Sequence, residues 1–212
     1  MKRFAKIGVV VAMAAIVLIQ GYGQYQQQCM AEGIAGKIIR FHVRANSDTS
    51  IDQELKRKVR DAIGAYMQPR LSGITDVAES RRVIEDSLGQ IEMQAQNALA
   101  EEGYHYPVEA SLTITDFPEK TYGSYTFAAG KYEALEVVIG KGKGQNWWCV
   151  MYPNMCFFNS VYEVVDKEAE ESLEHVLTKE EYKSLMEQKN YKVTSALFEW
   201  LEGKLQNIFC KH

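Results

Sequence analysis

The sequence lacks the residue patterns that mark most enzyme active sites. It has no H-E-x-x-H motif and no G-x-S-x-G nucleophile elbow, and no two of its histidines lie at the spacing of a helical metal site. Its 28 acidic residues include no pair whose separation the sequence fixes, so a glycosidase has no support. We therefore expect no catalytic constellation, no metal site and no cofactor. The four histidines are His42, His105, His175 and His212.

An excess of positive charge is also missing. The net charge is -4, which gives no reason to expect a nucleic-acid partner. Basic residues cluster at 56–60, but Asp52 and Asp61 flank them, so we interpret the run as the solvated face of a helix. The segment from Gly140 to Gly144 resembles a phosphate-binding loop in composition only. Because no helix pattern follows it, we expect a flexible turn.

An uncharged apolar run stands near the N-terminus. It extends from Ile7 to Ile19 and follows three basic residues. This order is typical of a secretory signal, and the run is short for a membrane span. We assign residues 1–23 to a signal peptide or an uncleaved N-terminal membrane anchor, with the rest of the chain exported across the cytoplasmic membrane. A buried helix is the alternative, but no acidic or amide residue interrupts the run.

Periodicity divides the remaining chain into a short linker and one domain. Residues 24–36 are glutamine-rich and lack a period, which indicates a linker. We assign residues 37–212 to a single α+β (mixed α/β) domain, in which helices cover an antiparallel or mixed sheet. Its C-terminal part has an acidic segment at 160–176 and helices at 178–209. We expect strands at 37–45, 108–115, 131–139 and around Trp147, and helices that begin near Ser50 and run from Asp76 to Gly103.

Local residues predict where helices begin and end. Ser50 with Gln53, and Thr178 with Glu181, have the spacing of a capping box, in which two side chains bond each other's backbone N–H groups. Pro69 should end the first helix, because a proline cannot donate the next helical hydrogen bond.

The first strand alternates apolar and polar side chains. We place its polar residues on the exposed face of a half-buried strand: Arg40, His42 and Arg44. A proton-shuttle role for His42 has no identified partner. Trp147 and Trp148 point to opposite faces of a later strand, so only one of them should enter a single core. The other indole could form a platform for a carbohydrate or a protein partner.

Export favours a disulfide interpretation of two cysteines. In an oxidising compartment Cys149 and Cys156 are candidates for a local disulfide, which would stabilise the fold by about 2.5 kcal/mol. Their C-x6-C spacing lacks the C-x2-C repeats of a zinc site. A tight turn at the centre of the loop would set Cys149 opposite Phe158, so the bond needs a wider or off-centre loop. Cys29 and Cys210 are either free or paired with each other.

Four blocks carry a specific resemblance. They are IRFHVRANSD at 39–48, YGSY at 122–125, AGKYEAL at 129–135 and IGKGKGQNWWCV at 139–150, followed by Cys156. In this order and with these contents the chain resembles the stage II sporulation protein R family from about residue 37 to 158. The NWWCV block with its second cysteine is the most specific part. The residues just before Cys156 depart from the family's pattern.

The resemblance implies an exported signalling protein of endospore formation. Such a protein is made in the forespore and acts in the space between forespore and mother cell, where it triggers a membrane-embedded aspartic protease that processes the precursor of sporulation sigma factor E. Its only membrane contact would be through the N-terminal segment. One rival is an extracytoplasmic hydrolase of cell wall or peptide, in which histidines or a reduced Cys149 converge with carboxylates. Another is a passive structural role between the membranes.

The resemblance also suggests where a partner binds. The candidates are polar or aromatic residues of the matching blocks. A buried strand and a turn that caps a helix would account for the same residues, and the sequence does not separate these interpretations. The candidate partner-binding residues are Arg40, His42, Arg44, Asn46 and Asp48, with Trp147 and Trp148.

Overall fold

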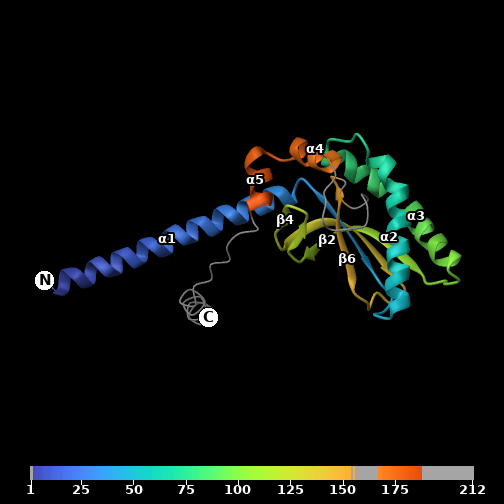
Figure 1. The fold of residues 1–212 in the computed structure, drawn as a ribbon, viewed down its shortest axis with the longest axis horizontal. Helices are drawn as coiled ribbons and strands as arrows, with labels where there is room; N and C mark the ends of the chain where they lie inside the picture. The colour runs from blue at the N-terminus through green and yellow to red at the C-terminus, as the bar shows by residue number, and fades with distance from the viewer. Residues whose placement is uncertain (1, 154, 156–166, 188–212) are drawn as a thin grey trace.

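A β-sheet lies at the centre of the molecule, with other elements packed on both of its faces. The computed structural model describes residues 2–153, 155 and 167–187. Two long helices cover one face, and the end of the first helix, a small hairpin and two short helices cover the other (Figure 1). The helices are α1 (Lys2–Ala35), α2 (Ser50–Leu71), α3 (Val77–Glu101), α4 (Lys167–Val176) and α5 (Lys179–Glu187).

The sheet is mixed, with strand order β2-β5-β1-β6. The two central strands, β1 and β5, are parallel, and the outer strands β6 and β2 pair with them antiparallel. A second, two-stranded sheet is formed by β3 and β4. The predicted α+β class with a mixed sheet in a single domain is confirmed. The strands are β1 (Ile39–Arg44), β2 (Val108–Phe117), β3 (Lys120–Tyr122), β4 (Tyr125–Phe127), β5 (Gly130–Ile139) and β6 (Asn146–Tyr152).

Two hydrophobic cores are separated by this sheet. Phe41 and the other odd-numbered residues of β1 pack against α2 and α3. The opposite core is rich in aromatic side chains, among them Phe117 and Phe127. Trp147 packs against the first core and Trp148 against the second. Each core therefore takes one tryptophan, as expected for a single core, and the second core, which was not expected, takes the other.

The predicted linker at 24–36 is helical almost to its end. α1 runs without a break from Lys2 to Ala35, a length of about 50 Å at 1.5 Å per residue, and projects away from the domain (Figure 1). The segment at 24–36 contains four glutamines, two alanines and one glutamate, all of which favour helix, and it contains no proline. Its last turns also pack into the second core, where Ile34 is 2% exposed. The lack of a clear amphipathic period hid this helix.

The start of α2 differs from its predicted capping box. Thr49, not Ser50, is the N-cap, and its hydroxyl accepts a hydrogen bond of 3.2 Å from the backbone N–H of Asp52. The side chain of Gln53 donates instead to a backbone carbonyl in the preceding turn, at 2.9 Å. A cap one residue earlier satisfies the same unpaired donors of the first turn.

Most other helix boundaries agree with the sequence. Asp76 caps α3, and Gly103 ends it with a φ of 79°. Thr178 and Glu181 form the predicted capping box, with bonds of 2.7 and 3.2 Å. Pro69 lies inside α2 rather than at its end, because near a helix terminus its missing N–H removes only one bond.

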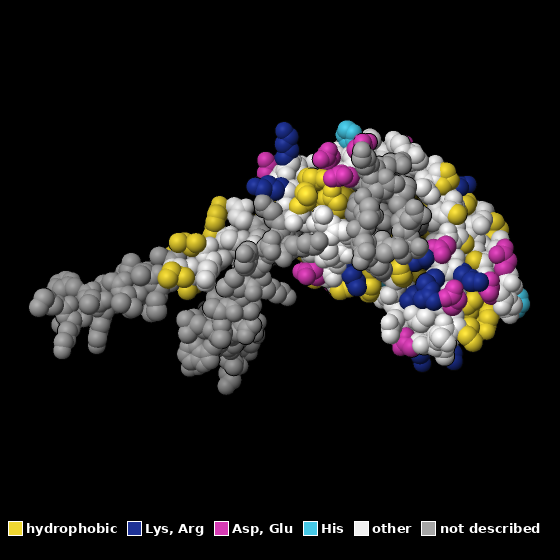
Figure 2. Space-filling model, in the orientation of Figure 1, with side chains coloured by type: hydrophobic (Ala, Val, Ile, Leu, Met, Phe, Trp, Pro, Cys, Tyr) yellow, Lys and Arg dark blue, Asp and Glu magenta, His cyan; other side chains and the backbone are white. Residues whose placement is uncertain are grey.

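Some predictions fall on residues that the structure does not describe. These are the acidic residues 160–166, the helices beyond 187, and Cys156 and Cys210. In the described part of the chain, no helix has a stretch long and apolar enough to cross a membrane. Residues 16–19 and two tyrosines of α1 nevertheless expose large apolar side chains, visible as yellow atoms along the stalk in Figure 2.

We expect Gly144→Ala to destabilise the domain. A Cβ at Gly144 would lie 2.2 Å from the carbonyl oxygen of Ser47. The backbone at Gly144 cannot move away easily, because its N–H donates a hydrogen bond of 2.9 Å to the Ala45 carbonyl. The free energy of unfolding should fall by about 2–3 kcal/mol, the range for overpacking. Gly89→Ala on α3 is the control, because a Cβ at Gly89 meets no atom within 4 Å. This substitution should raise the free energy of unfolding by about 0.5–1 kcal/mol. Urea denaturation measures both, and equal effects of the two substitutions would contradict this account.

Candidate interaction site around the central strand

The structure brings the seven predicted partner-binding residues together around β1. Antiparallel pairing sets His42 opposite Trp148, and Val43 opposite Trp147. Arg40 and His42 were placed on an exposed face, and this is wrong, since both are 0% exposed. β1 is a central strand covered on both faces, so its polar side enters the second core instead of solvent. A partner that docks on this structure does not reach these two side chains.

Arg40 is enclosed by aromatic rings. Its guanidinium carbon lies 4.6 Å from the ring centre of Phe117 and 5.1 to 5.8 Å from those of Tyr132, Phe127 and Tyr122. One nitrogen donates to the Tyr122 hydroxyl at 3.3 Å, whereas Nε and Nη1 make no hydrogen bond. Desolvation lowers the pKa of Arg40, and the two tyrosines Tyr122 and Tyr132 partly oppose this. The negative faces of the rings therefore stabilise a charge that no carboxylate among the described residues pairs with.

His42 lies next to this aromatic cluster. Its ring stacks on Trp148 with centroids 5.1 Å apart and an interplanar angle of 2°, and it contacts Phe117 edge-on at 5.4 Å. Its Nε2 is 3.6 Å from Glu136, too far for a hydrogen bond, and that carboxylate is held by Arg44 at 3.0 Å. Desolvation, and then the charge of Arg44, lower the pKa of His42 to about 4. The imidazole is therefore neutral near pH 7.

Asn46 and Asp48 hold the glycine turn in place. The Asn46 side-chain oxygen accepts from the Lys141 backbone N–H at 3.0 Å, and the Asp48 carboxylate accepts from that of Gln145 at 2.7 Å. Gly140 and Gly142 adopt a positive φ of 58°. The turn was expected to be flexible, but these bonds fix it against the end of β1. Both side chains therefore have a structural task, whatever else they contact.

Asp52 completes this arrangement and was missed as a site residue. It is 4% exposed and accepts from Ser47 at 2.5 Å and from the Asn46 amide at 2.9 Å. Burial alone would raise the pKa of Asp52, but hydrogen bonds from Ser47, Asn46, Tyr106 and Thr49 together hold it below its usual value. The sequence signal was the polar turn at 46–48 just before a helix, which is where an acidic side chain can accept several bonds.

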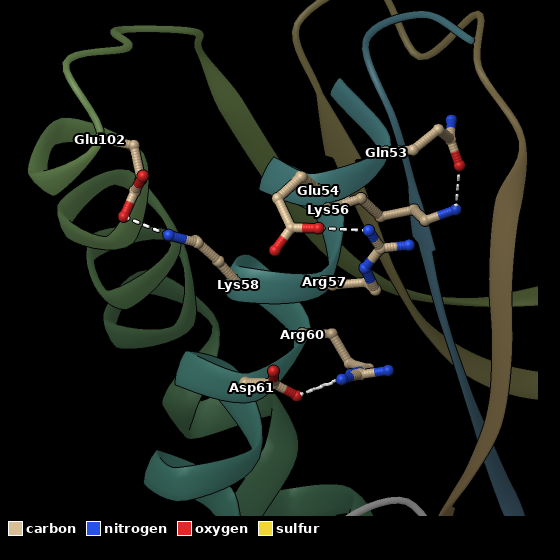
Figure 3. Close-up of polar contacts among 8 residues, drawn as sticks. All are labelled: Gln53, Glu54, Lys56, Arg57, Lys58, Arg60, Asp61 and Glu102. Carbon is tan, nitrogen blue, oxygen red and sulfur yellow. Dashed lines mark hydrogen bonds and ion pairs between the residues drawn. The ribbon is translucent and has the colours of Figure 1, made fainter. Parts of the chain in front are cut away.

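The basic run at 56–60 has two sides. Arg57 pairs with Glu54, and Lys58 pairs with Glu102, the residue that caps the end of α3, as Figure 3 shows. Lys56 and Arg60 are only 5% and 7% exposed, so the solvated-face interpretation is wrong for these two. The Lys56 ammonium donates to the Gln145 carbonyl at 3.0 Å, and Arg60 lies 4.1 Å over the ring of Trp147.

These contacts are those of a packed scaffold. Cys149 packs in the core beside α2 and α3, whereas His42 faces the opposite core, so the sheet separates this thiol position from that imidazole. His175 lines a hollow of 570 Å³ with Glu171, and His105 is exposed in the loop before β2. Among the described residues, no group of three metal-binding side chains is present. Cys156 lies outside the described residues, so the Cys149–Cys156 bond stays a prediction.

The similarity of the chain to known proteins decides its family. A family model described as stage II sporulation protein R matches residues 35–162, more than half of the chain. The chain belongs to the stage II sporulation protein R family. A curated member, the stage II sporulation protein R of Bacillus subtilis (strain 168), is 38% identical over 158 residues, which cover 70% of each chain. No solved structure matches the chain.

Membership in this sporulation family confirms the resemblance based on the sequence blocks. The matched residues contain all six strands, both long helices of the domain and the seven candidate residues. Most of α1, and α4 and α5, lie outside the match.

His42 should make stability depend on pH. The imidazole titrates near pH 6.5 when unfolded and at about 4 when folded. The unfolded chain therefore binds more protons between these values, and stability is lost as pH falls from 6.5 to 4. The loss of unfolding free energy from His42 should be about 3 kcal/mol.

His42→Phe, which keeps an aromatic ring in the stack, should flatten the dependence of the unfolding free energy on pH between 6.5 and 4. Urea denaturation from pH 7 to pH 4 measures it, and an unchanged slope would contradict the assignment. His105→Phe at an exposed site is the matched control.

Proposed function

We propose that this protein is an exported signal of sporulation that activates a membrane-embedded aspartic protease. The protein would act in the space between the forespore and the mother cell, and the protease would process the precursor of sporulation sigma factor E. Membership in the stage II sporulation protein R family is the observation that carries this proposal. The apolar N-terminal run supports export.

The polar side chains around β1 do not form the site that the rival hydrolase requires. Arg40 and His42 are sealed in a core, and Asn46, Asp48 and Asp52 are occupied by bonds within the fold. The rival hydrolase would need a histidine beside a nucleophile in an accessible cleft. Among the described residues, His175 lines a hollow together with Glu171 and Ser172, so this is the position at which the rival would have to act.

Activation would then be a shift of the protease between two states. A ligand changes such an equilibrium only if it binds one state more tightly. A protease that is 1% active when free becomes 99% active if the ligand prefers the active state by about 10⁴-fold, which corresponds to about 5.5 kcal/mol. Several buried contacts on a surface of ordinary interface size can supply this difference.

Reconstitution tests the proposal directly. The full chain is added to vesicles that contain the membrane-embedded protease and the precursor of sigma factor E. We expect processing to rise at least tenfold, and to rise equally with a variant in which His42 is Phe and the other three histidines are Asn, because binding needs no imidazole. Cleavage of wall material or peptide by the chain alone, abolished in the histidine variant, would favour the hydrolase instead. Unchanged processing would favour the passive structural role.

We also propose that Cys149 pairs with Cys156 after export. Cys149 is 4% exposed on β6, whereas Cys29 is a free, exposed thiol on α1. Alkylation of the exported protein in denaturant should label Cys29 and leave Cys149 and Cys156 unlabelled. After reduction, mass spectrometry should find two further labels at these positions. Labelling of Cys149 before reduction would contradict the bond. In a separate measurement, the double variant C149S/C156S should have a free energy of unfolding about 2.5 kcal/mol lower than that of the oxidised wild type.

A further inference from the structure

Strand β2 has an outer edge that no other strand of the described residues covers. It is the last strand in the order β2-β5-β1-β6 and pairs only with β5. The Pro107 carbonyl accepts from Gly140 on the β5 side, and the Ala110 N–H points the other way, to Glu92 of α3 at 2.9 Å. Because backbone groups alternate between the two sides of a strand, the N–H and C=O groups of Leu112, Ile114 and Asp116 also point outward.

Among the described residues, charged side chains stand at the two ends of this edge. Glu92 occupies the N–H of Ala110, and at the other end Asp116 places an exposed carboxylate on the strand, paired at 3.3 Å with Lys131 of the neighbouring β5. Charged side chains at such positions discourage other chains from pairing with an edge. Between them Ile114 is 63% exposed, and the described residues place no donor or acceptor against its outward backbone groups.

A hollow of 390 Å³ opens beside Ile114. The last turns of α1 form one wall, with Glu32, Ala35 and Gly36. Arg81 and Glu133 form another wall and are locked together by two hydrogen bonds of 2.7 Å. A residue on an added strand opposite Ile114 would direct its side chain to the same face, over this hollow.

We propose that the edge of β2 from Ala110 to Asp116 receives an extended, extracytoplasmic segment of the membrane-embedded protease as an additional strand. This inference rests on the proposed function. The segment pairs with the outward backbone groups of Leu112 and Ile114 and places a β-branched or other apolar side chain against Ile114 and the hollow. Main-chain bonds supply the affinity, and the hollow selects the side chain.

Charge selects this occupant over a second copy of the chain. Asp116 and Glu133 are already paired with Lys131 and Arg81, but Glu109 is exposed on β2, Glu92 lies beside it and Glu32 lines the hollow. A strand carrying lysine or arginine complements these carboxylates, whereas a second β2 would bring the same acids to both sides of the pair. Position favours it as well, because the wall of the hollow is α1, the helix that leads back to the apolar N-terminal run.

Two substitutions remove the proposed pairing without touching the β2–β5 pair. Ile114→Pro deletes an outward N–H, and proline is tolerated where a strand's N–H faces solvent. Ile114→Lys keeps the backbone and replaces the apolar contact with a charge. Ile51→Lys is the matched control, since Ile51 is 53% exposed on the first turn of α2, away from this edge. Thermal unfolding establishes that each variant is folded.

The experiment uses the full chain with vesicles that contain the protease, and it has two readouts. Processing of the sigma factor precursor reports activation, and hydrogen–deuterium exchange over residues 108–117 reports strand addition. We expect the wild type and Ile51→Lys to be activating and to show at least tenfold slower exchange when the protease is present. Folded Ile114→Pro and Ile114→Lys should lose at least tenfold in processing and show no protection.

Each other result has a distinct meaning. Activation without protection of residues 108–117, or activation by all variants alike, overturns this inference and leaves the proposed function standing. Protection without any processing overturns the proposed function and supports the docking edge. If neither processing nor protection is observed, both this inference and the proposed function are overturned. Protection that rises with protein concentration in vesicles without the protease identifies a second copy of the chain as the occupant. That result would overturn the assignment of the edge to a protease segment.

Discussion

The burial of β1 on both faces is the constraint on which the rest of this structure depends. A strand with arginine and histidine on one side normally leaves that side in water, but here β1 lies between β5 and β6 under a second core. Moving a guanidinium out of water costs several kcal/mol unless the site compensates. Four aromatic rings and one tyrosine hydroxyl surround Arg40 and provide that compensation. The aromatic composition of the second core is therefore tied to one buried charge.

The same strand also organises the turn at its other end. The chain leaves β1 through Asn46 and Asp48, which bind the glycine turn between β5 and β6, and then enters α2 through a cap on Thr49. Asp52, in the first turn of α2, joins these parts by accepting hydrogen bonds from the side chains of Asn46 and Ser47. One polar cluster thus fixes the β1–α2 connection and the β5–β6 connection at a common point. Residues that look like exposed recognition groups in the sequence are largely consumed by this internal task.

Local patterns predicted most of the fold because they act over a few residues. Strand alternation, the three-four spacing of apolar residues and the caps at Asp76 and Thr178 depend on neighbours in the chain. The prediction for β1 failed for a different reason. Its polar face is covered by Phe117, Phe127 and the end of α1, which are distant in sequence, and no local pattern reports that they return to cover it. The same distance concealed the second core that takes Trp148.

Under the proposed function, recognition depends on shape and on the backbone groups that remain available, because Arg40 and His42 are buried and the Asn46 and Asp48 side chains are bonded within the fold. The last turns of α1 pack into the second core through Ile34, so the helix that carries the apolar N-terminal run is fixed to the domain at its other end. If the proposed export leaves the leader uncleaved, α1 would tether the domain to the membrane and raise its effective concentration for the proposed membrane-embedded partner. If the leader is removed, the same surface must be found by diffusion and needs more intrinsic affinity. Retention or cleavage therefore changes how strongly the domain must bind, but not which surface is able to bind.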